Sequence, residues 1–407
     1  MPIPDLLLRA SRPARRLALG LATLALTATS HAAGAGTGGV LINPGDQGER
    51  SRFATYDALR GVVEAALKRE KLGELSIDLS TDAAQDLAST RSRTRDVFFA
   101  PAHVVGSALR YGYTPVMGVD RPVQAVLVAP KSSAIDSLDA ARGKALGLPA
   151  QDSVVTYLLR GEVNAANTTI KKHFGSVYQT RYQEALLVCL QLRRCDVVVV
   201  EKAVFDRWSA AGEPVKAVMQ SKPVPGLSVA VRQGSPAAAA LPALQNALAG
   251  AFNASESAQT LGRLVPVDTP AFEYVSTLGY FTPRALPGAK VVDATAVGQL
   301  MGAGATYIDT RTEAEFKAGH VPGARLVPYV EKSAKEADFD ASQDTFDLAK
   351  LPQDRNAALV FACNGAECWK SFKASHAALK AGYKQVHWFR GGFPEWRAAG
   401  LKLDRID

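Results

Sequence analysis

The sequence predicts an α/β protein that contains more than one domain. Stretches typical of strands alternate with stretches typical of helices almost throughout, which favours largely parallel sheets. The chain has 407 residues, which exceeds the length of one ordinary domain. The alternation lapses near residues 281–291, where two prolines and a glycine indicate a linker. The composition, 47% apolar and 21% charged, is that of a globular protein with a large core.

The elements expected before the linker follow from the spacing of apolar residues. Residues 56–72 carry apolar side chains at helical spacing, and Gly112 would end a helix over 102–112. We expect strands within 39–45, 74–80, 95–102, 123–130 and 226–234. We expect further helices within 152–165 and 241–254, and helix–strand pairs within 137–149 and 182–201.

The same alternation resumes after the linker and predicts a second α/β domain. We expect strands within 306–311, 325–329, 358–363 and 385–389, and helices within 293–304, 312–319 and 370–382. The acidic stretch 331–350 has no clear pattern and is interpreted as a loop or short helix.

The first 33 residues have the features of an export signal. Arginines between positions 9 and 16 precede an apolar run, and Ser30 and Ala32 fit the small-residue rule for cleavage. The run is too short to span a bilayer, and no later segment has the pattern of a membrane span. We therefore expect a periplasmic protein whose mature chain begins near Ala33 or Gly34. The expected division is a signal peptide over 1–33, a first domain over 34–280, a linker over 281–289 and a second domain over 290–407.

The charge pattern argues against a nucleic-acid partner. The formal net charge is +8, but no block of five or more like charges occurs, so the basic residues are interpreted as a solvated surface. The six histidines are dispersed, and neither cysteine pair has the partners of a zinc site. We therefore expect no metal and no cofactor.

The four cysteines fall in two local pairs, Cys189 with Cys195 and Cys363 with Cys368. An exported protein meets an oxidising compartment, so each pair must be judged against disulfide formation. We expect a local disulfide between Cys189 and Cys195, with two buried free thiols as the alternative.

Cys363 has the setting of a reactive thiol. It ends the apolar stretch 358–363 and precedes a loop and a helix, at the sheet edge where sites form in open α/β folds. Backbone N–H groups of the loop 364–369 and the positive end of the helix would favour the thiolate, which is the nucleophilic form of cysteine.

The second domain resembles rhodanese domains over about 290–404. "YIDTRTEAEFKAGHVPGARLVPY" is similar to the first rhodanese signature, and "VFACNGAECWKS" with the later "RGGFPEW" is similar to the second. The resemblance implies a central parallel sheet. It also implies that Cys363 accepts sulfane sulfur from a donor such as thiosulfate, becomes a persulfide and passes the sulfur to an acceptor. Asp309 and Arg311 would support the site.

The active loop departs from the common rhodanese pattern. Cys368 stands where many rhodaneses carry Arg, and Lys370 would take the cationic role if the loop is longer by about two residues. Cys368 is a resolving or redox partner of Cys363, a passive residue, or half of a permanent disulfide. Trp369 forms a wall of the site or fills core space. The remaining candidate loop residues are Asn364, Gly365, Ala366 and Glu367.

The first domain resembles periplasmic substrate-binding proteins of the phosphonate/phosphite (PhnD-like) type. The resemblance rests on "RDVFFAPAHVVGSAL", "VQAVLVAPKSSAIDSLDAARGKALGL" and "CDVVVVEKAVFD". It implies a type II binding protein with two α/β lobes, crossing strands near 121–130 and 222–232, and a second lobe over about 125–225. A cleft of this kind binds oxyanions with helix N-termini and hydroxyls. The candidate cleft residues are Ser153, Thr156, Ser132, Ser133, His103, Tyr56 and Glu201, while Asp152 would repel an anion unless it only caps a helix.

Two functions from different classes are consistent with these features. The first is an exported rhodanese-type sulfurtransferase fused to an oxyanion-binding domain, with a thiol reductant as a partner. The alternative is a solute receptor for an ABC transporter or a sensor, in which the rhodanese domain is a non-catalytic or dithiol-redox appendage. The expected ligand is a small oxyanion or a sulfur donor.

Overall fold

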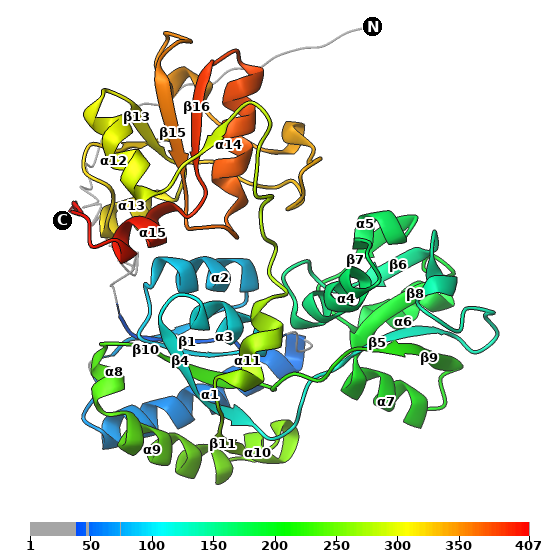
Figure 1. Cartoon of the computed structure of the whole chain (residues 1–407). Coiled ribbons are helices and arrows are strands. Elements are labelled where there is room, and N and C mark those ends of the chain that lie inside the picture. The colour runs from blue at the N-terminus through cyan, green and yellow to red at the C-terminus, as the bar shows by residue number, and fades with distance from the viewer. Residues whose placement is uncertain (1–37, 46–48, 74, 407) are drawn as a thin grey trace, which may run out of the picture. The chain divides into compact units, whose positions relative to one another are not determined.

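The computed structural model describes residues 38–45, 49–73 and 75–406. The expected signal peptide lies outside the described residues. The described residues belong to one compact unit, and they form three β-sheets (Figure 1).

The first sheet has six strands in the order β11-β4-β10-β3-β1-β2. Strand β1 runs parallel to β2 and β3, whereas β10 is antiparallel to β3 and β4, and β11 is antiparallel to β4. The strands are β1 (Val40–Ile42), β2 (Ile77–Leu79), β3 (Val97–Ala100), β4 (Tyr113–Val119), β10 (Ser228–Arg232) and β11 (Leu264–Pro266). The helices of this lobe are α1 (Glu49–Arg69), α2 (Ala83–Ser92), α3 (Ala102–Leu109), α8 (Pro236–Ala239), α9 (Leu241–Asn253), α10 (Glu256–Leu261) and α11 (Pro270–Ser276).

The second sheet has five strands in the order β7-β6-β8-β5-β9. Strand β6 is parallel to β7 and β8, and β5 is antiparallel to β8 and β9. The strands are β5 (Ala125–Pro130), β6 (Ala145–Leu148), β7 (Ser176–Gln179), β8 (Val197–Glu201) and β9 (Val215–Gln220). The helices are η1 (Asp139–Ala141), α4 (Val154–Ala165), α5 (Ile170–His173), α6 (Glu184–Gln191) and α7 (Lys202–Ala210).

Two segments connect these sheets. The chain leaves the first sheet after β4 and enters the second at β5, and it returns between β9 and β10. Val123 and Val224 pair in an isolated antiparallel bridge, so the two connecting segments lie side by side. Two mixed sheets joined by two adjacent crossings form the two-lobed type II binding-protein fold that the sequence predicts.

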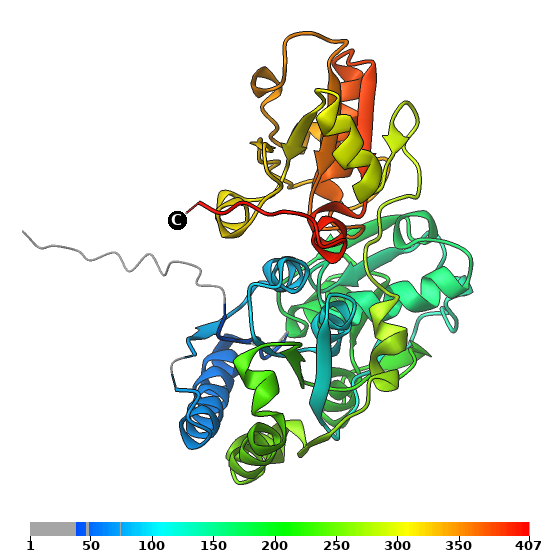
Figure 2. The ribbon, with the colours of Figure 1, turned by 60° about the vertical axis from the view of Figure 1, so that its left-hand side comes forward.

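The third sheet is wholly parallel, with the order β12-β16-β15-β13-β14. Parallel strands need crossover connections, and helices supply them on both faces of the sheet (Figures 1 and 2). The strands are β12 (Lys290–Val291), β13 (Thr306–Asp309), β14 (Arg325–Leu326), β15 (Ala358–Ala362) and β16 (Gln385–Phe389). The helices are α12 (Ala294–Gly302), α13 (Glu313–Ala318), η2 (Ala341–Gln343), η3 (Leu348–Lys350), α14 (Trp369–Lys380) and α15 (Gly392–Ala398).

The central strand β15 shows why this sheet is buried on both faces. Leu359 and Phe361 pack into a cluster that includes Ala374 and Ala378 of α14. Val360 and Ala362 point the other way, into a cluster built partly by α12 and α15. Side chains alternate between faces along a strand, so an uninterrupted apolar run is required here. The same run delivers Cys363 to the carboxyl edge of the sheet.

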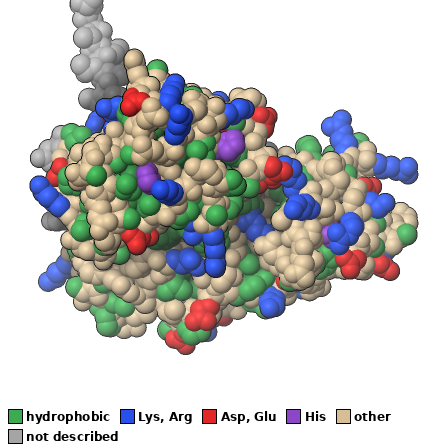
Figure 3. Space-filling model, turned by 45° about the horizontal axis from the view of Figure 1, so that its top comes forward, with side chains coloured by type: hydrophobic (Ala, Val, Ile, Leu, Met, Phe, Trp, Pro, Cys, Tyr) green, Lys and Arg blue, Asp and Glu red, His purple; other side chains and the backbone are tan. Residues whose placement is uncertain are grey.

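Among the described residues, no helix is both long and apolar enough to cross a membrane. On the face drawn in Figure 3, Lys and Arg side chains are dispersed among hydrophobic and uncharged surface.

Candidate functional site

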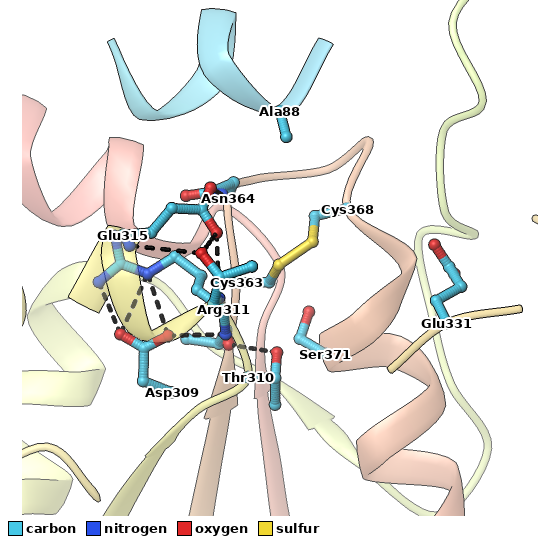
Figure 4. The surroundings of a disulfide bond; sticks show 12 residues. Ala88, Asp309, Thr310, Arg311, Glu315, Glu331, Cys363, Asn364, Cys368 and Ser371 are labelled. Carbon is cyan, nitrogen blue, oxygen red and sulfur yellow. Dashed lines mark hydrogen bonds and ion pairs between the residues drawn. A yellow bond between two sulfur atoms is a disulfide. The ribbon is translucent and has the colours of Figure 1, made fainter. Parts of the chain in front are cut away.

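Cys363 and Cys368 are joined by a disulfide. Cys363 directly follows β15, and Cys368 is the N-cap residue of α14, so the disulfide spans the strand-to-helix loop at the carboxyl edge of the parallel sheet (Figure 4). Both cysteines are buried, with 1% and 6% of their surface exposed. We call residues 363–368 the active loop.

The start of the active loop is held by two neighbouring segments. Thr310, at the end of β13, donates from its backbone N and its Oγ1 to the carbonyl of Ala362. Phe393 N donates to the carbonyl of Cys363 over 2.8 Å. Gly392 has φ +59°, and a Cβ placed on it would lie 2.1 Å from the Cys363 carbonyl oxygen. Only glycine therefore fits at 392, both for its backbone conformation and for its contact with the loop.

The polar side of the loop is organised by a carboxylate. Asn364 donates from Nδ2 to Glu315 Oε1 over 2.6 Å. Burial raises the pKa of Glu315, but hydrogen bonds from Thr312 and the charges of Lys370 and Arg311 outweigh it, so the pKa lies below its ordinary value. Glu315 is therefore ionised at neutral pH. Lys370, in the first turn of α14, contributes its charge to this carboxylate.

The far side of the loop is tied to the segment between α11 and β12. Thr282 donates from its backbone N and its Oγ1 to the Ala366 carbonyl, in both cases over 2.8 Å. Trp369 donates from Nε1 to the Tyr280 carbonyl, and its ring stacks edge-on with Phe372. Trp369 is 4% exposed and belongs to a small apolar cluster, so it both fills core space and anchors the loop.

Asp309 and Arg311 form a buried ion pair beside the loop. The guanidinium donates from Nε and Nη2 to the carboxylate, and Nη2 also donates to the Gly319 carbonyl over 2.8 Å. Burial lowers the pKa of Arg311, but the carboxylate of Asp309 outweighs it and raises the pKa above its ordinary value. The pair fixes the turn after β13, and with it Thr310.

This arrangement determines what the two sulfurs can do. In the oxidised loop neither sulfur is a thiolate, so neither is a nucleophile. Reduction would leave Cys363 at the end of β15 and Cys368 at the N-terminus of α14, where the helix dipole favours an anion. Three roles for Cys368 are consistent with the sequence. Its pairing with Cys363 contradicts a passive residue and is compatible with a redox partner and with a permanent disulfide.

Glu367 makes a contact that the sequence did not reveal. Its Oε2 accepts a hydrogen bond from Tyr111 Oη over 3.1 Å. Burial, together with the charge of Glu367, raises the pKa of Tyr111 above its ordinary value, so the phenol stays protonated as a donor. No local pattern marks Tyr111, because the two residues are 256 positions apart.

The candidate residues of the binding domain are distributed over several cavities. Glu201 lines a cavity of about 600 Å³ to which both lobes contribute. Gln183, directly before α6, donates from Nε2 to Glu201 Oε1 and accepts from the Glu201 backbone N. Ser153 lines a second cavity of about 540 Å³ together with Asp152. His103 lines a small third cavity of about 20 Å³. The three cavities adjoin one another, since Val154 lines the first and third and Thr81 lines the second and third.

The hydroxyl groups at the start of α4 are already engaged. Ser153 is the N-cap of α4 and accepts from Thr156 N, while its own hydroxyl donates to Thr156 Oγ1 over 3.0 Å. Thr156 Oγ1 donates to the Ala150 carbonyl over 3.0 Å. Both side chains are buried. They stabilise the helix start in this conformation and offer no hydrogen to a ligand.

His103 and Asp152 also have specific partners. His103 Nε2 lies 2.8 Å from the Asp152 carbonyl oxygen, so Nε2 carries the hydrogen. Burial lowers the pKa of His103 to about 4. Lys335 Nζ contacts both carboxylate oxygens of Asp152, at 2.9 and 3.1 Å. This ion pair compensates the negative charge that the sequence analysis expected to repel an anion.

The other candidate residues lie away from these cavities. Ser132 is exposed, and Ser133 Oγ accepts from Ile135 N in the turn after β5. Tyr56 is buried within α1. Arg121, which the sequence analysis did not select, lines the 600 Å³ cavity from the first crossing segment and donates to the Thr260 carbonyl. Its position directly after β4 is the signal that could have identified it.

Cys189 and Cys195 form the second disulfide, as the sequence predicts. Cys189 lies in α6 and Cys195 precedes β8. Both are buried in the apolar cluster that packs α6 and α7 on the second sheet. This bridge has a structural setting, away from the active loop.

Comparisons with known proteins match each part of the chain separately. Residues 54–272 match the family described as ABC transporter, phosphonate, periplasmic substrate-binding protein. Residues 293–399 match the rhodanese-like domain.

Several curated proteins and solved structures are similar to parts of the chain. An HTH-type transcriptional regulator of Mycobacterium tuberculosis is 35% identical over 99 residues, or 24% of this chain and 37% of the regulator, so the chain spans just over a third of that relative. Thiosulfate sulfurtransferase 16 of Arabidopsis thaliana is 30% identical over 110 residues, or 27% of this chain and 88% of that protein. The structure of PhnD1 from Prochlorococcus marinus in complex with methylphosphonate has a TM-score of 0.46 and 12% identity, covering 60% of this chain and 97% of that chain.

Proposed function

Because the chain belongs to the phosphonate family of periplasmic substrate-binding proteins and carries a rhodanese-like domain over residues 293–399, we propose that it is an exported sulfurtransferase whose sulfur carrier is Cys363. The observation that carries the proposal is the active loop itself. A cysteine at the carboxyl edge of a parallel sheet is followed by a loop and by the N-terminus of a long helix. That setting favours a thiolate and stabilises negative charge on sulfur.

The first step requires the reduced loop. The Cys363 thiolate attacks the outer sulfur of thiosulfate, the sulfur–sulfur bond of the donor breaks, and sulfite leaves with the electron pair. Cys363 then carries a persulfide. The reduced state must come from a thiol reductant, because the disulfide removes the nucleophile.

The second step can follow two routes. An external nucleophile such as cyanide or a thiol can take the outer sulfur and return Cys363 to the thiolate. Alternatively, the Cys368 thiolate attacks the inner sulfur of the persulfide, and hydrosulfide leaves with the electron pair. The second route forms the Cys363–Cys368 disulfide, whose formation between these two residues supports it. Along this route, thiosulfate and two thiols are converted to sulfite, hydrogen sulfide and one disulfide.

Two assays on the reduced full-length protein separate these routes. In a thiosulfate:cyanide assay we expect turnover by the wild type and by Cys368→Ser, and none by Cys363→Ala. In a sulfide-release assay with thiosulfate and no cyanide, we expect one sulfide per wild-type chain and none from Cys368→Ser. Turnover by Cys363→Ala equal to the wild type would refute the proposal.

For the binding domain we propose that the 600 Å³ cavity receives a small oxyanion. Arg121, Lys202 and Arg207 line it. Lys202 pairs with Asp206 and Arg207 pairs with Glu184, which leaves Arg121 as the basic lining side chain without an ion pair among the described residues. Thiosulfate would connect this cavity with the chemistry of Cys363. Isothermal titration with thiosulfate, sulfite, phosphite and methylphosphonate tests the proposal, and Arg121→Gln is expected to remove the binding site that this cavity provides.

The alternative function is a solute receptor whose rhodanese domain is a redox appendage. The 600 Å³ cavity to which both lobes contribute, the inter-lobe cavity, favours this function, because residues of the active loop take no part in lining it. Ligand binding combined with no sulfur transfer by the reduced protein would favour the receptor over the sulfurtransferase.

A further inference from the structure

A second cavity, of about 340 Å³, contains an unusual concentration of arginines. We call it the arginine cavity. It is lined from α2 and its C-terminal turn, from β10, and from three segments of the rhodanese-like domain. Its charged lining residues are Arg93, Arg232, Arg311, Arg397, Arg405 and Glu315.

The positive charge of the arginine cavity is only partly compensated by the described residues. Arg311 is paired with Asp309, and Arg232 is paired with Asp96. Among the described residues no ion pair is recorded for the other three arginines. Within the described part of the chain, the side-chain hydrogen bonds of Arg93 and Arg397 go only to backbone carbonyls, those of Gln233 and Ser92, at the long distances of 3.5 and 3.4 Å. Arg405 is exposed at the rim.

Two observations show that these cations crowd each other in a partly dry site. Arg93 Nε is buried and has no hydrogen-bond partner among the described residues. Burial, and then the neighbouring charge of Arg93, lower the pKa of Arg397 to about 10. Buried donors without partners and adjacent like charges both cost free energy. A bound anion would remove both costs at once.

We propose that the arginine cavity binds a compact tetrahedral oxyanion, such as sulfate, thiosulfate or phosphate. Guanidinium groups present paired N–H donors that match the geometry of such oxyanions. Phe393 and Leu403 add an apolar wall, which accommodates an oxyanion carrying a small organic group. This site is separate from the inter-lobe cavity, with which it shares no lining residue.

The arginine cavity is also connected to the active loop. Glu315 lines the cavity and accepts a hydrogen bond from Asn364, which directly follows Cys363. Figure 4 shows Arg311, Glu315 and Asn364 side by side near the disulfide. The arginine cavity therefore adjoins the residue pair that positions the start of the loop.

The test uses the oxidised full-length protein, because no persulfide can form while the disulfide is intact. Isothermal titration with sodium sulfate and with sodium phosphate, against sodium chloride at equal ionic strength, is expected to give one site that persists in Arg121→Gln. Arg397→Gln and Arg405→Gln are each expected to weaken binding about tenfold or more, as expected for loss of a charge-assisted hydrogen bond. Because the Arg405 side chain is exposed, Arg405→Gln should fold normally, so weaker binding by this variant is not explained by misfolding.

The matched control is Arg355→Gln, which removes the same charge from an exposed position of the same domain. It is expected to leave the affinity unchanged. No binding of either oxyanion by the wild type, or equal weakening by Arg355→Gln and Arg405→Gln, would overturn the proposal. Binding of sulfate without binding of phosphate would identify a sulfur oxyanion as the ligand. Binding of phosphate without binding of sulfate would identify phosphate. Failure here would leave the chemistry of Cys363 untouched, because the oxidised protein does not perform it.

Discussion

Lys373 provides a direct test of how α14 is fixed behind the active loop. Its side chain is fully buried, and Nζ lies 2.7 Å from Glu331 Oε1 and 3.7 Å from Asp344 Oδ2. It also donates to Ser333 Oγ and to the Ser333 carbonyl, over 2.8 and 3.1 Å. Through these contacts one cation connects α14 to Glu331, Ser333 and Asp344 of the acidic stretch 331–350. Replacing Lys373 by Met keeps the apolar stem and removes the charge.

The expected cost follows from the groups that remain. Removing one partner of a buried ion pair typically costs about 3–5 kcal/mol, since the other charge stays buried. Glu331 is 14% exposed and can be partly hydrated. Asp344 keeps hydrogen bonds from Tyr329 and Ser333. We therefore expect Lys373→Met to lower the unfolding free energy of the rhodanese-like domain by about 3 kcal/mol, at the lower end of that range.

Urea unfolding followed by tryptophan fluorescence measures this change. Of the four tryptophans, Trp369, Trp388 and Trp396 lie in the rhodanese-like domain, so the signal reports mainly on that domain. Lys380→Met is the matched control, because Lys380 is exposed in the last turn of the same helix. If the two variants lose equal stability, the buried cation does not fix α14 and this reasoning is wrong.

Three further outcomes are expected. Gly392→Ala should lower both stability and thiosulfate:cyanide turnover more than Gly400→Ala does. Both glycines have positive φ, but only at 392 would a Cβ meet the Cys363 carbonyl. Equal losses in the two variants would contradict this close contact. His103 has a pKa of about 4 in the folded protein and 6.5 unfolded, so the unfolded state binds the proton first and stability falls as pH drops from about 6.5 towards 4. Relative to His103→Gln, the wild type should lose about 3 kcal/mol between pH 7 and pH 4, and parallel pH profiles would contradict a neutral buried imidazole. Reduction of the Cys363–Cys368 bridge should lower the free energy of unfolding by about 2 kcal/mol, because a bridge with a sequence separation of 5 restricts the loop of the unfolded chain. Cys368→Ser lacks this bridge, so reductant should not cause this loss in that variant.

The features predicted from the sequence are those encoded in local patterns. The uninterrupted apolar run before Cys363 requires a strand buried on both faces, and the family signatures around it identify the rhodanese-like domain. The short spacing between Cys189 and Cys195 predicts their disulfide correctly. The two-lobed fold follows from a resemblance that extends over most of the first domain.

The features that were missed are assembled from residues far apart in the sequence. The arginine cavity combines Arg232 and Arg397, which have no basic neighbours in the sequence, with Arg93, which belongs to the short basic run 91–95. In the sequence Lys373 has the pattern of an ordinary solvent-exposed helix lysine. Its ion pairs cannot be predicted, because only the folded domain brings Glu331 and Asp344 to it. Sequence patterns record periodicity and spacing, but they do not record which distant charges are buried together.

The hydroxyls of Ser153 and Thr156 illustrate a different limit. Their positions at a helix start are those of an anion site, yet the same positions allow them to bond to each other and to the preceding carbonyls. Short polar side chains often satisfy local backbone groups in this way.

Peptide mass spectrometry of the reduced protein after brief exposure to thiosulfate tests the central proposal most directly. We expect an adduct of about 32 Da, one sulfur atom, on Cys363 of the wild type. In Cys368→Ser the same adduct should accumulate, because no internal thiol resolves it, and in Cys363→Ser it should be absent. An adduct confined to Cys368, or no adduct on either cysteine while reduction is verified, would contradict the assignment of Cys363 as the sulfur carrier.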